Sequence, residues 1–113
     1  MQFTLKSGHN AGRRRIWIEG ARLIDLGLTP KTRLTRVMED ADIGPDTMTL
    51  TTVSGIKGRR HSISGTADRP ILDMCGVWVT DFMDGHSHFH VEAVTYSDSD
   101  GTYLDLVITP VNA

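Results

Sequence analysis

The chain has 113 residues, of which 39% are hydrophobic and 23% charged, and this length is typical of one domain rather than two. Its single cysteine excludes an internal disulfide and a zinc site built on several cysteines. The sequence contains no run of about 18 apolar residues, which would predict a membrane span. Its first residues lack the apolar stretch of a signal peptide. We therefore expect one soluble, cytoplasmic domain covering residues 1–113.

The basic residues are distributed unevenly along the chain. The formal net charge is only −2, yet all 12 Lys and Arg residues lie in the first 69 positions, and residues 70–113 contain none. Such an asymmetry between two parts of a chain suggests a charged partner.

The first part of the chain predicts short strands and one short helix. Residues 3–5 and 15–19 alternate apolar and polar side chains, as strands do. After Gly20, the apolar spacing over residues 23–28 fits one or two helical turns, which Pro30 terminates.

A hairpin is predicted next. Residues 33–38 and 48–53 are alternating and β-branched, and they flank the turn-forming segment 42–46. The apolar run 70–74 then predicts a further strand.

The end of the chain repeats this order. Val79, Phe82 and Met83 have the spacing i, i+3 and i+4, which predicts a short helix over residues 77–83. Segments 86–96 and 102–109 are joined by an Asp-Gly turn and predict a second hairpin.

An internal repeat is indicated by an offset of 56 positions. This offset places Gly20 on Gly76 and Leu23 on Val79. Each half alone would lack a complete core, which is typical of repeat proteins. We expect repeat one over about 13–53, a Gly-rich linker over about 54–68 and repeat two over about 69–110.

The stretch from Arg15 to Leu34, followed by a hairpin ending in Met48–Thr51, resembles the SymE-like branch of the AbrB/MazE swapped-hairpin superfamily. The segment from Ser64 to Met74 is similar to a repeat in phage and bacterial accessory proteins of this group, including N-terminal extensions of some DNA cytosine methyltransferases. The resemblance covers most of residues 13–110. It implies a mainly β fold, a swapped-hairpin AbrB-like β-barrel formed by two repeats with one short helix each.

The resemblance also implies DNA binding through basic residues of the first strand and its flanking loops. Two features depart from the family pattern. Lys31 stands where the family has Gly, which is tolerable if the backbone there avoids positive φ. The second copy is expected to lack basic residues, which argues against a symmetric DNA clamp.

The basic residues near the first strand and in the expected linker are candidates for binding nucleic acid, because guanidinium groups pair with phosphate and glycine allows close approach. Arg33 and Arg36 differ in parity on their strand, so only one should join the patch. A solvated cationic surface and an acidic protein partner remain alternatives. The candidates for contacting duplex DNA are Arg13, Arg14, Arg15, Arg33, Lys57, Arg59 and Arg60.

A different hypothesis is a phage-encoded inhibitor of anti-CRISPR or anti-restriction type that binds a host defence protein or nucleoprotein complex, using its acidic C-terminal half or its basic patch. Carboxylates would then occupy a site normally filled by phosphate. A homodimer pairing the basic half of one chain with the acidic half of another is a third possibility. The acidic candidates are Asp73, Asp81, Asp84, Asp98 and Asp100.

A row of histidines is the feature closest to a catalytic or metal motif. On a strand, His86, His88 and His90 would project from one face and could hold a metal together with a carboxylate. A solvated outer face is the favoured interpretation, and no nucleophile triad, phosphate-binding loop or dinucleotide motif is present. We therefore expect a non-enzymatic protein without a metal or cofactor.

Overall fold

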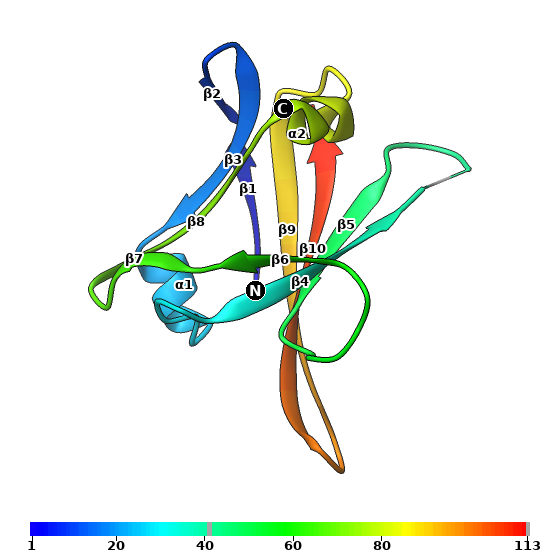
Figure 1. Ribbon diagram of the computed structural model, residues 1–113. Coiled ribbons are helices and arrows are strands. Elements are labelled where there is room, and N and C mark those ends of the chain that lie inside the picture. Colours follow the sequence, from blue (N-terminus) through cyan, green and yellow to red (C-terminus); the bar gives the residue numbers. More distant parts are fainter. Residues whose placement is uncertain (41, 113) are drawn as a thin grey trace.

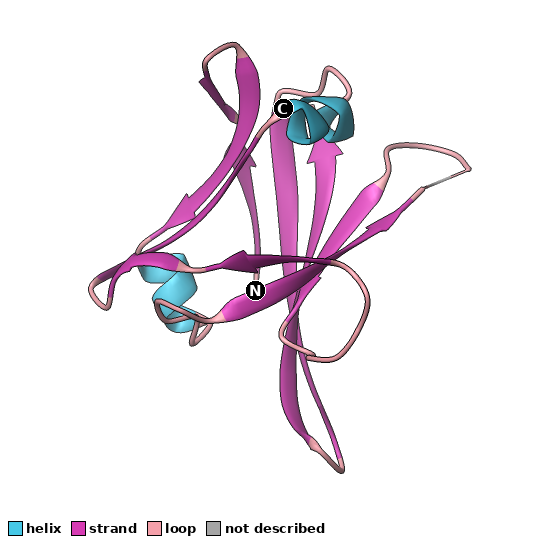
Figure 2. Ribbon diagram, viewed as in Figure 1, coloured by secondary structure: helices cyan, strands magenta, loops and turns pink. Residues whose placement is uncertain are grey.

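The computed structural model describes residues 1–40 and 42–112, and over these residues the fold is mainly β, with two antiparallel sheets and two short helices (Figures 1 and 2). The larger sheet contains, in spatial order, β1 (Gln2–Lys6), β9 (His88–Asp98), β10 (Gly101–Val111), β5 (Thr47–Thr51), β4 (Arg33–Glu39) and β6 (Arg59–Ser62). The smaller sheet contains β2 (Gly8–Asn10), β3 (Arg13–Glu19), β8 (Arg69–Cys75) and β7 (Ser64–Thr66). The helices are α1 (Ala21–Asp25) and α2 (Val77–Met83).

Most predicted elements are confirmed in type and position. The seven predicted strands and both helices are present, and α2 covers the predicted residues 77–83. Strands β2, β6 and β7 were not predicted, and the last two lie within residues 54–68, the segment expected to be a linker. No helix in the described residues is long and apolar enough to cross a bilayer.

The element order occurs twice. Strand β3 begins at Arg13 and β8 at Arg69, while α1 begins at Ala21 and α2 at Val77, so both pairs are separated by 56 positions. Strands β6 and β7 precede β8 as β1 and β2 precede β3, and β7 lies 56 positions after β2. The second set of elements therefore begins at β6 rather than at β8.

The choice of boundary decides which basic residues are counted with the second set of elements. Arg59 and Arg60 lie in β6, and Arg69 opens β8, so a second set counted from β6 includes three cations. The charge asymmetry along the sequence therefore does not coincide with a division of the elements at β6.

Strands of one set of elements pair with strands of the other. Strand β3 pairs with β8 and β5 pairs with β10, while β1 pairs with β9 and β6 with β4. Trp17 lies opposite Asp73 and Leu50 opposite Leu106, and in each pair the residues are 56 positions apart. The register therefore defines an approximate two-fold axis through these two residue pairs.

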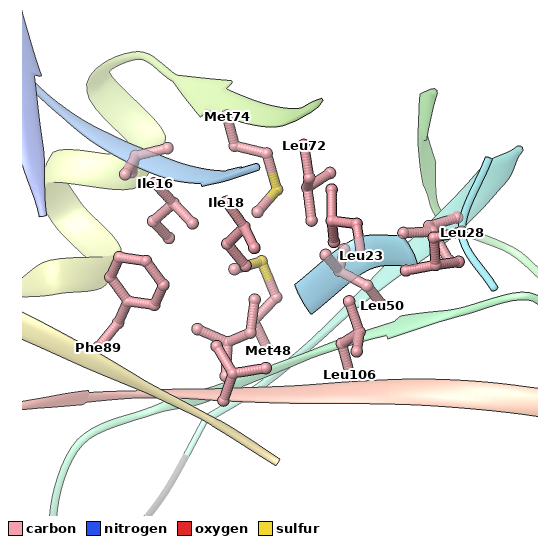
Figure 3. Packing of buried hydrophobic residues seen from close by; sticks show 14 of the residues in the cluster. Ile16, Ile18, Leu23, Leu28, Met48, Leu50, Leu72, Met74, Phe89 and Leu106 are labelled. Carbon is pink, nitrogen blue, oxygen red and sulfur yellow. The ribbon is translucent and has the colours of Figure 1, made fainter. Parts of the chain in front are cut away.

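One hydrophobic cluster fills the space between the sheets. Ile18 and Leu72 from the smaller sheet face Leu50 and Leu106 from the larger one, as Figure 3 shows. All four residues are almost fully buried. Because alternate strand residues point to opposite faces, this burial leaves the polar residues between them on the outer faces of the sheets.

The turn before β4 has an unusual backbone. Lys31 has a φ of 74°, so the condition under which lysine would replace the family's glycine without strain is not met. Its backbone N–H donates to the carbonyl of Ile63 at 2.8 Å, and the N–H of Ile63 donates to the carbonyl of Thr32 at 2.8 Å. These two hydrogen bonds compensate for the strain of a non-glycine residue in this conformation.

Candidate nucleic-acid interface

Four of the predicted phosphate-binding cations lie at the β4–β6 edge of the larger sheet or in the loop leading into it. The register places Arg33 opposite Ser62 and Arg60 opposite Thr35, so Arg33 and Arg60 are diagonal neighbours on one face. Arg59 lies opposite Arg36 on the other face, and Lys57 is exposed in the loop before β6. All are exposed except Arg36, which is partly buried.

Arg36 and Arg59 form a like-charged cross-strand pair. Directly opposed residues have Cβ atoms about 5 Å apart, and equal charges at this separation destabilise a sheet. Neither guanidinium has a carboxylate partner within the described residues. A bound anion would remove this repulsion.

Trp78 of α2 holds Arg36 in place. The guanidinium carbon of Arg36 lies 3.6 Å from the centre of the Trp78 ring, a close cation–π contact. The His61 ring packs on the same indole with centroids 5.7 Å apart. Nη1 of Arg36 and Nε2 of His61 are buried without a hydrogen-bond partner in the described part of the chain. The indole of Trp78 therefore packs against Arg36 and His61, where a hydrogen-bonding partner for these two side chains would otherwise lie.

The pKa values of this cluster reflect burial among cations. Burial lowers the pKa of Arg36 from its ordinary value, and the charge of Arg59 lowers it further. Burial, with smaller effects from Arg36 and Arg59, lowers the pKa of His61 to about 4. His61 is therefore neutral at pH 7, and the positive charge is carried by the arginines.

Gly58 sets the path of the loop into β6. Its φ is 156°, and a Cβ at this position would overlap the carbonyl oxygen of Arg36. The loop backbone therefore passes directly against β4, which brings Lys57 close to the same edge. Glycine is required here for close approach as well as for its conformation.

The three consecutive arginines of β3 have separate environments. Arg13 is exposed, whereas Nη1 of Arg14 donates to Oγ of the buried Ser7 at 2.8 Å. Arg15 donates through Nε and Nη2 to the two carboxylate oxygens of Asp73 at 2.8 and 2.9 Å. Since Asp73 balances the charge of Arg15, the structure divides the predicted set into an unpaired group on β4–β6 and a largely engaged group on β3.

Trp17 lies on the outer face of the smaller sheet and is partly exposed. The guanidinium carbon of Arg15 lies 4.1 Å from the centre of its ring. A neighbouring ion pair joins Arg69 to Glu19 at 2.6 Å and lowers the pKa of Glu19. Trp17 is therefore neither a core residue nor a free stacking platform.

The predicted acidic candidates have different local environments. Asp73 pairs with Arg15, Asp84 ends α2 in a left-handed conformation, and Oδ1 of Asp98 accepts a hydrogen bond from the Asp100 backbone. Asp81 is exposed on α2. Their roles include pairing, helix termination and turn formation.

The histidines of the row are each engaged with near neighbours. Nδ1 of His86 contacts the carbonyl oxygen of Met83 at 2.9 Å, and Nδ1 of His88 contacts Oγ of Ser87 at 2.7 Å. Nδ1 of His90 contacts Oγ1 of Thr4 on β1 at 2.9 Å. In residues 1–40 and 42–112, no group of three or more His, Cys, Asp or Glu side chains could hold a metal ion.

Sequence reasoning missed three residues of the β4–β6 site: Arg36, His61 and Trp78. They come from separate elements and meet only through the β4–β6 register and the packing of α2. Applying the offset of 56 positions to the predicted strand 3–5 would have placed a strand at residues 59–61 and so indicated that Arg59 and His61 belong to one.

Comparison with protein-family models, with curated proteins and with solved structures finds no match for this chain.

Proposed function

We propose that the protein is a non-enzymatic DNA-binding regulatory or accessory module and that the β4–β6 edge contacts the phosphate backbone of duplex DNA. The observation that carries this proposal is the opposed pair Arg36 and Arg59, which has no carboxylate partner in the described residues. Arg33, Lys57 and Arg60 extend the same edge. A polyanion bound there would neutralise the repulsion and satisfy several donors at once.

We further propose that the architecture is the swapped-hairpin arrangement of AbrB-like proteins, with both repeats in one chain. This is supported by the pairing of strands between the two sets of elements and by the approximate two-fold register at Trp17–Asp73 and Leu50–Leu106. In this arrangement the arginine pair occurs once. Arg36 lies opposite Leu50, and the pseudo-equivalent position on β9, opposite Leu106, is Ala93, which is hydrogen-bonded to Met1 rather than paired with a second arginine.

A salt titration of DNA binding tests the proposed function. Up to five phosphate contacts predict a slope of about −4.5 for log affinity against log salt, or a loss of up to about 500-fold between roughly 50 and 200 mM. We expect a double substitution, Arg59→Ala with Arg60→Ala, to weaken binding to a labelled duplex and reduce the slope by about 2.

Lys6→Ala provides the matched control, because Lys6 is exposed on β1 at the opposite edge of the same sheet. Its effect on the slope should be small. Arg13→Ala tests whether the β3 surface, which was predicted from the sequence, contributes to DNA binding in addition to the β4–β6 edge. The proposal would be abandoned if wild-type protein showed no salt-sensitive binding at about 50 mM salt, or if the double variant bound as tightly as wild type.

A further inference from the structure

A second candidate site lies on the outer face of the larger sheet, away from the opposed arginines. A groove of about 370 Å³ is lined by Val37, Glu39, Thr49, Thr51, Val53, Ile56, Tyr96 and Asp105. Its volume falls within the range of sites for small ligands or short peptide segments. The lining combines an aliphatic surface, an aromatic ring and two carboxylates.

The walls of the groove are fixed by the fold. Thr52 begins the loop that contributes Val53 and Ile56, and it is joined to Leu104 of β10 by two hydrogen bonds of 3.0 and 2.9 Å. The close approach of Gly58 to β4 secures the other end of this loop. The groove is thus present before any ligand binds, which reduces the conformational cost of binding.

One end of the groove presents an oriented carboxylate. The hydroxyl of Tyr96 donates to Oδ1 of Asp105 at 3.1 Å. Tyr96 is 38% exposed, and Ile56, which also lines the groove, is 39% exposed. Neither Asp105 nor Glu39 has a cationic partner within the described residues. A cation with an apolar stem would complement this end of the groove.

We infer that the groove binds an extended peptide segment of a partner protein through an arginine side chain. The guanidinium would pair with Asp105 and stack on Tyr96, while its methylene groups pack along Val53 and Ile56. Lysine fits less well because its ammonium group provides neither a planar face nor a fork of donors.

Glu39 lies at the opposite end of the groove and favours a second cation. Thr47, opposite Glu39, and Thr51, opposite Asp105, are about 13 Å apart along β5, and the strands of Glu39 and Asp105 are about 10 Å apart across the sheet, which gives a backbone separation of about 16 Å. Residues four apart in an extended peptide span about 13 Å and point to the same side, and the length of two arginine side chains covers the remaining few ångströms. The peptide is therefore expected to carry arginines at positions i and i+4 with aliphatic or threonine residues between them.

Isothermal titration with acetyl-Arg-Val-Thr-Val-Arg-amide tests this inference, with a peptide carrying citrulline at both arginine positions as the neutral isostere. We expect wild-type protein to bind the arginine peptide and the citrulline peptide to bind about tenfold more weakly or worse. Asp105→Asn should remove most of this preference. Asp100→Asn, at the exposed tip of the β9–β10 hairpin, is the matched acidic control and should retain it.

Equal binding of the two peptides, or no heat of binding at a protein concentration near 1 mM, would overturn the inference. The peptide comparison needs only the wild-type chain, so it stands even if Asp105→Asn fails to fold. Thermal unfolding shows whether Asp105→Asn is folded. The affinity of Asp105→Asn for duplex DNA should remain within a few fold of wild type, which distinguishes binding in the groove from binding at the proposed DNA-binding edge.

Discussion

His61 is expected to make the stability of the protein depend on pH. Its pKa is lowered to about 4, compared with 6.5 for an ordinary histidine. The unfolded chain therefore binds a proton below pH 6.5, while the folded chain does so only near pH 4. The stability that depends on a neutral His61 is complete above pH 6.5 and is lost as the pH falls toward 4.

The size of this effect follows from the difference between the two pKa values. At about 1.4 kcal/mol for each pH unit, the upper limit is about 3 kcal/mol. Because His61 is partly exposed, solvent screening reduces the expected loss to about 2 kcal/mol. This loss adds to that caused by other groups that titrate over the same range.

His61→Phe isolates the contribution, since phenylalanine keeps a ring against Trp78 and removes both the titration and the buried, unpaired Nε2. Urea unfolding at pH 7 and pH 4 should show that the stability of wild type relative to His61→Phe decreases by about 2 kcal/mol at the lower pH. His9 is exposed, and His9→Gln is the control. The stability of wild type relative to His9→Gln should be the same at pH 7 and pH 4. A proton titration by NMR that places the His61 pKa near 6.5 would refute the reasoning.

Two further substitutions test the fold. Leu50→Ala removes a fully buried side chain at the two-fold contact with Leu106, and denaturant unfolding should show a loss of about 2–5 kcal/mol; a loss below about 1 kcal/mol would contradict the tight packing of this contact. Gly58→Ala should cost at least about 2 kcal/mol more than Gly55→Ala, because a Cβ at Gly58 meets the backbone of β4, whereas the space around Gly55 is open. Equal costs for the two glycine variants would show that conformational strain alone explains both.

Much of the fold could be predicted because the long strands bury one face. The alternation in residues 15–19 and 102–109, and the helical spacing of Val79, Phe82 and Met83, follow directly from contact with the shared core. Strands β2 and β7, of three residues each, contain almost no apolar side chains. They form by pairing with β3 and β8, and this tertiary contact leaves no periodic pattern in the local sequence.

The candidate site was predictable only in part. Composition identified Arg33, Arg59 and Arg60 as cations without indicating which of them share a face. That assignment depends on the β4–β6 register, which pairs residues more than 20 positions apart. Sequence proximity was misleading for Arg15, whose charge is balanced by Asp73 on β8, 58 positions further along the chain.

The pairing of strands between the two sets of elements has a consequence for unfolding. Each set of elements completes its sheets only with strands from the other, so neither can open as an independent cooperative unit. Amide protons of α1 and α2 that exchange through global opening should therefore become exposed in the same event. The loop over residues 52–58 joins the two sets, and cleaving it should leave both fragments associated. Shortening this loop should instead favour pairing between separate chains. In the resulting swapped dimer, the contacts that one chain makes within itself would form between two chains.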